Sequence, residues 1–205
     1  MSRFLGPRLK VARALGIELP GLTTRTLERR PYPPGQHGVS PRRRKISPYR
    51  IRLDEKQKLR FNYGLTERQL RNLVRRAAAG SSNTGERLLE LLEARLDNVV
   101  FRAGFAATIP AARQLVNHGH ITIDGRRVTF PAVSVRRGQR IGLSTRGEKM
   151  EHVLASLARP RLIPPSWLQI DAETRTAAIA ATPDGTGVPM PLDVRLVVEF
   201  YAQRA

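Results

Sequence analysis

Residues 95–130 read RLDNVVFRAGFAATIPAARQLVNHGHITIDGRRVTF, and this stretch decides the fold of the second half of the chain. Apolar residues recur at helical spacing from residue 88, before this stretch, to residue 103 within it. They are Leu88, Leu89, Leu92, Leu96, Val99, Val100 and Ala103. This stripe predicts one helix over residues 86–103 that ends at Gly104. Thr108 is a suitable N-cap for a second helix over about 109–118, which tolerates Pro110 in its first turn and ends at Gly119.

The remainder of this half favours short strands. Asp124-Gly125 lies between two alternating runs and predicts a β-hairpin over residues 120–130. Similar patterns predict strands at 133–135 and 139–143, a helix from Thr145 to about Leu157, and a second hairpin from 167–170 and 176–180. We therefore expect a compact α/β module over residues 95–181, with two helices and a hairpin-rich sheet.

Residues 46–94 read as helices. Asp54-Glu55-Lys56-Gln57 and Thr66-Glu67-Arg68-Gln69 each have the form of a capping box, with stops at Gly64 and Gly80. In the second helix the apolar residues share one face, and Arg68, Arg71 and Arg75 share the other. Residues 182–205 carry a last apolar segment, Val194–Tyr201, expected to return and complete this helical domain. The predicted fold class is α+β.

The charge distribution points to a polyanionic partner. The chain holds 36 Lys and Arg against 17 Asp and Glu, and residues 1–80 alone hold 20 basic and five acidic residues. Arg outnumbers Lys by 31 to five, which favours bidentate phosphate contacts. The alternative, a basic surface kept for solubility, does not explain why the charge concentrates at one end. Nucleic acid is the expected partner.

Residues 1–45 are predicted to be an extended basic arm. They hold 11 basic residues, many prolines and few apolar residues, so the composition does not favour an independent core. Arg29-Arg30-Pro31 leads into a turn-rich stretch at 32–38, and Arg42-Arg43-Arg44-Lys45 forms a compact cationic run. We expect RNA to order this arm, although a solvated linker is the alternative for the cationic run.

Composition also excludes several classes of site. The sequence has no Cys, which excludes disulfides, thiol catalysis and cysteine-ligated zinc. Its four His are scattered, so we expect no metal and no cofactor, and the pair His118 and His120 does not predict a metal site. Instead, His120 is expected to face RNA or solvent. Aromatic residues make up 5% of the chain, too few for a base-stacking platform. No apolar run reaches membrane-spanning length, so a cytoplasmic location is expected.

Several motifs resemble the S4 family of bacterial small-subunit ribosomal proteins, and the resemblance covers essentially the whole chain. They occur in order as Pro33-Pro34-Gly35-Gln36-His37-Gly38, Glu55-Lys56-Gln57-Lys58-Leu59-Arg60, Tyr63-Gly64, Glu67-Arg68-Gln69, Ala94-Arg95-Leu96-Asp97-Asn98-Val99-Val100-Phe101-Arg102, Ala112-Arg113-Gln114-Leu115-Val116-Asn117-His118-Gly119-His120-Ile121, Asp124-Gly125 and Val197-Val198-Glu199-Phe200-Tyr201. The two motifs at 94–102 and 112–121 are similar to the RNA-binding module named after this family.

The resemblance implies a structural, non-enzymatic protein that binds small-subunit (16S) rRNA directly and nucleates assembly of the subunit body. It further implies contact with ribosomal protein S5, a role with S5 and S12 in translational accuracy, and, for some members, repression of their own mRNA. Membrane and small-molecule partners are not implied.

Two departures from the family pattern stand out. Many relatives carry four N-terminal cysteines that bind zinc, whereas residues such as Leu9, Ala12 and Arg25 occupy those positions here, as in the zinc-free form. The module's second helix often begins Thr-Arg, but here Thr108 is followed by Ile109. One phosphate contact is thereby lost and more weight is expected on Arg113.

Two other classes of function are compatible with parts of the sequence. Pseudouridine synthases use an Arg-Leu-Asp stretch whose Asp attacks the base, and Arg95-Leu96-Asp97 matches it. An Asp that pairs with a neighbouring Arg is the simpler reading, because such enzymes need a separate catalytic domain. A repressor or RNA-quality factor that uses the module alone would need neither the arm nor the helices of 46–80.

No catalytic residue is therefore predicted, and the candidate site is an RNA-binding surface. Its predicted members are Arg3, Lys10, Arg29, Arg30, Gln36, His37, Arg42, Arg43, Arg44, Lys45, Lys56, Lys58, Arg60, Arg68, Arg71, Arg75, Arg95, Arg113, Gln114, His118 and His120.

Overall fold

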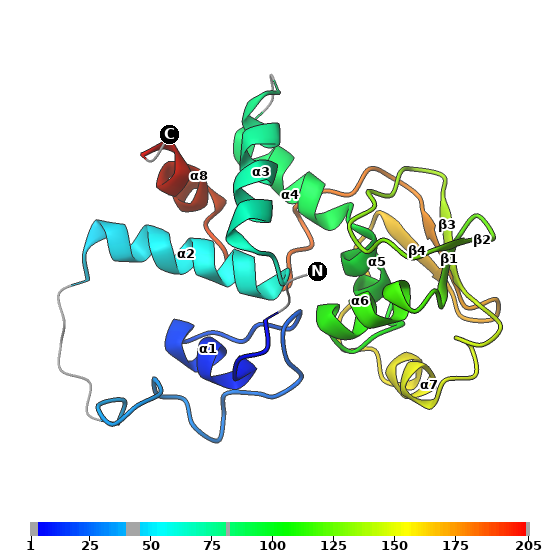
Figure 1. Ribbon diagram of the computed structural model, residues 1–205, viewed down its shortest axis with the longest axis horizontal. Coiled ribbons are helices and arrows are strands. Elements are labelled where there is room, and N and C mark those ends of the chain that lie inside the picture. Colours follow the sequence, from blue (N-terminus) through cyan, green and yellow to red (C-terminus); the bar gives the residue numbers. More distant parts are fainter. Residues whose placement is uncertain (1–3, 40–45, 81–82, 204–205) are drawn as a thin grey trace. The chain divides into compact units, whose positions relative to one another are not determined.

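The computed structural model describes residues 4–39, 46–80 and 83–203. The chain forms two compact units, one made of residues 1–88 with 188–205 and the other of residues 89–187. In the described part the elements are eight helices and five strands, which confirms the α+β class (Figure 1). No helix among the described residues is long and apolar enough to cross a membrane.

The first unit is helical. Its helices are α1 (Arg8–Leu15), α2 (Pro48–Asn62), α3 (Glu67–Ala78), the first half of α4 (Thr84–Glu93) and α8 (Val194–Ala202). α8 packs on α2 and α3, so the C-terminal segment returns to complete the helical domain, as the apolar run predicted. Leu59, Leu70, Val197 and Phe200 are buried among these helices.

The start of α2 differs from the prediction. The helix begins at Pro48 with Ser47 as N-cap, whose hydroxyl accepts a hydrogen bond from the Arg50 N–H at 3.2 Å. Asp54, predicted as the start, lies inside the helix and accepts a hydrogen bond from Arg50 Nε at 2.8 Å. A proline in the first turn and a serine before it are favourable there, and they extend the helix by two turns.

The capping box of α3 is confirmed. Thr66 Oγ1 accepts from the Gln69 N–H at 3.3 Å, and Gln69 Oε1 accepts from the Thr66 N–H at 3.0 Å. Leu70, Leu73 and Val74 are buried by this helix, which confirms the predicted apolar face.

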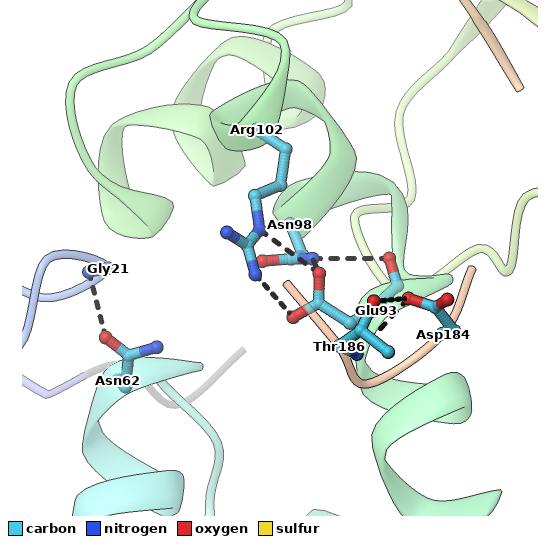
Figure 2. Close-up of polar contacts among 7 residues, drawn as sticks. All are labelled: Gly21, Asn62, Glu93, Asn98, Arg102, Asp184 and Thr186. Atoms are coloured by element: carbon cyan, nitrogen blue, oxygen red, sulfur yellow. Dashed lines mark hydrogen bonds and ion pairs between the residues drawn. The ribbon is translucent and has the colours of Figure 1, made fainter. Parts of the chain in front are cut away.

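The N-terminal segment contains a helix that its composition did not predict. Ala12 of α1 is buried, as are Leu19 and Leu22 in the loop that follows. The Gly21 N–H donates a hydrogen bond of 2.9 Å to Asn62 Oδ1 at the end of α2 (Figure 2). This part of the predicted arm therefore packs on α2, because its few apolar residues contact a helix far away in sequence.

The second unit combines three helices with one antiparallel sheet. Its elements are the rest of α4, α5 (Leu96–Arg102), α6 (Ile109–Asn117), β1 (Ile121–Ile123), β2 (Arg126–Val128), β3 (Arg140–Leu143), α7 (Glu151–Ala158), β4 (Leu168–Asp171) and β5 (Thr176–Ile179). The strand order is β2-β1-β3-β5-β4. Both predicted hairpins are confirmed, with Ile121 opposite Val128 in the first and Leu168 opposite Ile179 in the second.

The predicted single helix over 86–103 is wrong, because it is broken between α4 and α5. Arg95 is extended, with φ −72° and ψ 136°. The Leu96 N–H donates to the Val133 carbonyl at 2.8 Å, and the Val135 N–H donates to the Ala94 carbonyl at 2.7 Å. These long-range hydrogen bonds replace helical ones. They also explain why residues 133–135 form one β-bridge, Arg95 to Ser134, instead of a strand.

Helix α7 begins later than predicted. Thr145 does not cap it; instead Ser144 Oγ accepts from the Gly147 N–H at 3.1 Å and closes a turn. The helix then starts at Glu151, after Met150. The α6 prediction is confirmed, since Thr108 Oγ1 accepts from the Ala111 N–H at 3.3 Å.

Candidate nucleic-acid interface

An ionic cluster joins the start of α5 to α6. Asp97 is buried, with 1% of its side chain exposed. It accepts hydrogen bonds from Arg95 Nε at 3.1 Å, from Arg95 Nη2 at 2.8 Å and from Arg113 Nε at 2.7 Å. The break at Arg95 makes this possible, because a continuous helix would direct the two neighbours of Leu96 away from each other.

This cluster tests the expected pairing within Arg95-Leu96-Asp97. The expected pairing of Asp97 with an arginine is confirmed, and two arginines share it. A carboxylate that accepts three charge-assisted hydrogen bonds and is shielded from solvent is a poor nucleophile for a base. Arg95 is itself buried, and the side chain of Arg113 is 17% exposed. Both arginines therefore hold the module together, whatever they contact outside it.

A second buried ionic cluster lies beside the first in sequence. Glu93 accepts from Arg102 Nε at 3.1 Å and from Arg102 Nη2 at 3.0 Å, a bidentate pair (Figure 2). Asn98 Nδ2 donates to Glu93 Oε2 at 2.9 Å and to the Glu93 carbonyl at 3.2 Å. The hydrogen bond from Asn98 gives a partner to the Glu93 carbonyl, which is one of the last carbonyls of α4 and lacks a partner within the helix. Arg102 is consequently a structural residue.

The outer face of α3 is cationic and exposed. Arg68, Arg71 and Arg75 are all exposed on it, together with Arg76, which the prediction did not include. Within the described part of the chain none of these four side chains forms an ion pair. Like charges at this spacing repel one another, so the face is suited to an anionic partner.

The predicted residues of α2 have internal partners. Lys56 is buried; its ammonium donates to Glu67 Oε2 at 3.0 Å and lies 4.6 Å from the centre of the Phe200 ring. Lys58 pairs with Glu55, and Arg60 Nε donates to Gln57 Oε1 at 2.9 Å. These side chains tie α2 to itself, to α3 and to α8, and Lys56 in particular is not available to a partner.

Glu67 is held in its charged form by the same contacts. Burial by itself would raise the pKa of Glu67, but hydrogen bonds from Tyr201 Oη at 2.7 Å and from Lys56 outweigh burial and lower it. The pKa of Tyr201 is raised, first by burial and then by the Glu67 carboxylate. The phenol therefore stays protonated and donates to Glu67.

The predicted residues of the N-terminal segment lie mostly on the surface. Lys10, Arg29, Arg30, Gln36 and His37 are exposed. The predicted residues Arg3, Arg42, Arg43, Arg44 and Lys45 lie outside the described residues. The described part of this segment thus presents a second exposed cationic surface, separate from that of α3.

Comparison with known proteins assigns the family. Residues 3–93 match the model described as "Ribosomal protein S4/S9 N-terminal domain", and residues 94–141 match the model described as "S4 domain". The chain is 55% identical over 204 residues to the small ribosomal subunit protein uS4 of Methylobacillus flagellatus, with 100% of both chains covered. The chain belongs to the uS4 family. It is also 52% identical to uS4B of Nitrosomonas europaea and 50% identical to uS4 of Rippkaea orientalis, again over the full length of each chain.

Within the S4 domain, the histidines of the α6–β1 junction occupy different environments. Gln114 and His118 are exposed, whereas His120 is 9% exposed, which contradicts the expectation that its side chain faces solvent. Its N–H donates to the Leu115 carbonyl at 3.0 Å and its carbonyl accepts from the Ser144 N–H at 2.9 Å, which hold it between α6 and β3. Burial lowers the pKa of His120, and the charges of neighbouring His118 and Arg146 lower it further.

His118 and His120 contact each other at the α6–β1 junction. The His118 and His120 rings meet edge to face, with centroids 6.2 Å apart. Among the described residues there is no group of three or more His, Asp or Glu side chains that could hold a metal ion. The two histidines are therefore interpreted as packing and surface residues.

Several exposed arginines of the S4 domain were absent from the predicted set. They are Arg126, Arg127, Arg136, Arg137 and Arg140, on β2, β3 and the loop between them. Arg127 Nη2 donates to the His118 carbonyl at 3.1 Å, and Arg137 Nε donates to the Ala180 carbonyl at 3.1 Å. Neutral carbonyls orient these side chains without cancelling their charge. The sequence contained a signal for these residues, because Arg126-Arg127 follows Gly125 and Arg136-Arg137 precedes Gly138. Both glycines have positive φ and lie in turns.

Proposed function

We propose that this protein is a structural constituent of the small ribosomal subunit and binds small-subunit (16S) rRNA directly. The observation that carries the proposal is the exposed face of α3, where four arginines have no ion-pair partner among the described residues and the opposite face is buried. Membership of the uS4 family indicates that the polyanion is ribosomal RNA, because the relatives of this chain are named as proteins of the small ribosomal subunit.

Binding is expected to be dominated by phosphate contacts. Arginine side chains that meet phosphates fix position on a folded RNA more than they read its sequence. If about 6 to 10 phosphates are neutralised, the affinity falls by roughly 10³ to 10⁵ between about 50 and 200 mM salt. The buried arginines Arg95 and Arg102 and the buried Lys56 are left out of the surface that we propose.

The proposed surface therefore has three parts. The first is the exposed face of α3, the second is the N-terminal surface that includes Arg29 and Arg30, and the third is the set of exposed arginines of the S4 domain with Gln114 and His118. We also propose the corresponding division of the chain into an N-terminal arm, 1–45, a helical domain, 46–94 with 182–205, and an RNA-binding module, 95–181.

The decisive experiment is equilibrium binding to the 5′ domain of small-subunit rRNA, compared with an unrelated folded RNA of equal length across a salt series. Selective binding with a steep salt dependence supports the proposal. Equal affinity for the two RNAs, or a flat salt response, contradicts it.

Matched variants locate the interface on α3. Arg71→Gln with Arg75→Gln removes two charges from the proposed face, and Arg159→Gln with Arg195→Gln removes two exposed charges elsewhere. The first pair is expected to lower affinity and flatten the salt slope by roughly 0.7 to 0.9 per lost phosphate contact, more than the second pair does. Equal effects of the two pairs would show that total charge, and not this face, governs binding.

The absence of enzymatic activity is part of the proposal. Its support is the engagement of Asp97 by Arg95 and Arg113, which leaves no free carboxylate in the Arg-Leu-Asp stretch. A pseudouridine assay on rRNA fragments tests it: no base conversion is expected, and conversion that is lost in Asp97→Asn would overturn it.

Further roles rest on the family alone. We propose that the protein acts in the cytoplasm, nucleates assembly of the subunit body and contacts ribosomal protein S5. We also propose that it acts with S5 and S12 in translational accuracy. Repression of its own mRNA is a second candidate activity. Binding to purified S5 and to its own mRNA leader, measured with an unrelated protein and leader as controls, tests the two direct contacts.

A further inference from the structure

A pocket lies beside α1 in the first unit. It has a volume of about 240 Å³ and is lined by Leu9, Arg13, Thr26, Leu27, Arg29 and Arg30. We propose that this pocket binds one phosphate group of the RNA backbone, held by the guanidinium groups of Arg13, Arg29 and Arg30. The inference rests on the proposed RNA-binding function and adds a discrete site to it.

Arg13 is already held in place at this pocket. Its Nε donates to the Tyr32 carbonyl at 3.0 Å and its Nη2 to the Pro33 carbonyl at 3.4 Å. Its guanidinium carbon lies 5.0 Å from the centre of the Tyr32 ring. These partners are neutral, so they orient Arg13 without cancelling its charge, and about three of its five N–H groups remain for a ligand.

Arg29 and Arg30 supply the remaining donors. Both are exposed, and neither side chain forms a hydrogen bond or ion pair with any residue that the structure describes. Among the residues that the structure describes, no carboxylate lines the pocket. Glu28 is exposed outside the lining set, and the Glu18 carboxylate accepts a hydrogen bond from the N–H of the lining residue Leu27 at 3.2 Å. Three positive charges thus share a pocket whose described lining side chains include no carboxylate.

The volume of the pocket and its apolar lining side chains restrict the kind of ligand that it can bind. Its volume of about 240 Å³ is smaller than the ~300 Å³ or more of sites that take larger organic ligands. This favours a small anionic group such as a single phosphate. The apolar side chains of Leu9 and Leu27 keep the surroundings less polar than bulk water, which strengthens each guanidinium–phosphate contact.

The test uses the full-length protein and the 5′-domain rRNA fragment in phosphate-ethylation interference mapping. Arg29→Gln with Arg30→Gln is compared with wild type and with the control pair Arg159→Gln with Arg195→Gln. Wild type is expected to show a set of phosphates whose ethylation blocks binding. The pocket variant loses this sensitivity at one or two adjacent phosphates and has a salt slope smaller by about 1 to 2. Interference patterns that are the same for the pocket variant and the control pair would overturn the proposal.

Two further measurements separate the sources of phosphate and guard against misfolding. Thr26→Glu introduces a carboxylate at an exposed lining position and is expected to abolish the same interference signal while the circular dichroism spectrum stays that of wild type. Thermal unfolding of the RNA-free protein in inorganic phosphate, against chloride at equal ionic strength, tests the free anion. Stabilisation that needs Arg29 and Arg30 while RNA interference stays unchanged would assign the pocket to free phosphate and overturn the RNA assignment.

A failure of the pocket proposal can be distinguished from a failure of the proposed function. If wild type does not prefer the 5′-domain RNA, the proposed function fails before the variants are compared. If wild type prefers it and the pocket variant behaves like the control pair, the pocket alone is excluded.

Discussion

The pair formed by Glu93 and Arg102 permits a quantitative prediction about stability. Their side chains are 0% and 2% exposed, and they are joined by two hydrogen bonds of 3.0 and 3.1 Å. Glu93→Gln keeps the shape of the side chain but removes the charge, and it turns one acceptor into an amide that faces Arg102 or Asn98. The buried guanidinium then lacks its counter-ion, which costs about 3 to 5 kcal/mol of unfolding free energy. That is a large share of the roughly 5 to 15 kcal/mol that a domain possesses.

The assay is urea unfolding followed by tryptophan fluorescence. Trp167 is the one tryptophan of the sequence, is buried, and belongs to the same unit as the pair. Arg102→Met alone is expected to destabilise by a similar amount, because it leaves the buried Glu93 carboxylate without its guanidinium counter-ion, while Asn98 donates to it only as a neutral amide.

The double variant tests whether Glu93 and Arg102 stabilise the protein through their interaction with each other. Since Glu93→Gln and Arg102→Met each remove the same interaction, the double variant is expected to lose at least ~2 kcal/mol less than the sum of the single losses. Glu173→Gln, an exposed glutamate of the same unit, is the control and is expected to change stability by less than about 0.5 kcal/mol. A loss below ~1 kcal/mol for Glu93→Gln, or additive losses, would refute the reasoning.

Three more perturbations test other parts of the structure. Arg113→Glu places a second carboxylate beside buried Asp97 and is expected to lower the unfolding free energy by about 3 kcal/mol or more. The loss is measured by urea unfolding followed by Trp167 fluorescence. A variant that keeps wild-type stability and loses only RNA affinity would contradict this. Glu67→Gln is expected to destabilise the helical unit most above pH ~4.5, because the pKa of Glu67 is lowered in the folded state and its contacts stabilise the fold only when the carboxylate is ionised. The difference in stability from wild type, measured by circular dichroism, is expected to shrink as the pH falls through that lowered pKa. A difference that does not change with pH would contradict this. Thr66→Ala removes the N-cap of α3 and is expected to cost about 1 kcal/mol, seen as faster amide exchange in the first turn of α3, and unchanged exchange there would exclude the cap as a source of stability.

Elements with a local cause were predictable from the sequence. Thr66, Thr108 and the turn at Asp124-Gly125 act through hydrogen bonds and dihedral angles within a few residues, and all three are found where the sequence predicts them. Periodicity likewise located the buried face of α3.

The features that escaped prediction depend on contacts distant in sequence. The helix break at Arg95 follows from hydrogen bonds between residues 94–96 and 133–135, which no local pattern reveals. The same holds for α1, whose few apolar residues suffice because they pack on α2. A basic residue near a motif looked like a phosphate ligand from sequence, but Lys56 and Arg95 proved to be buried with partners in the fold. Only the structure separates internal cations from surface ones.

The return of α8 to α2 has a consequence for synthesis on the ribosome. Residues 89–187 are all translated before α8, whereas α2 and α3 must wait for residues 188–205 to cover them. At roughly 5 to 20 residues per second, translation of that last stretch takes on the order of 1 to 4 seconds. During this interval the earliest part of the nascent chain lacks the helix that packs on it. Premature termination after residue 187 would therefore leave α2 and α3 without α8.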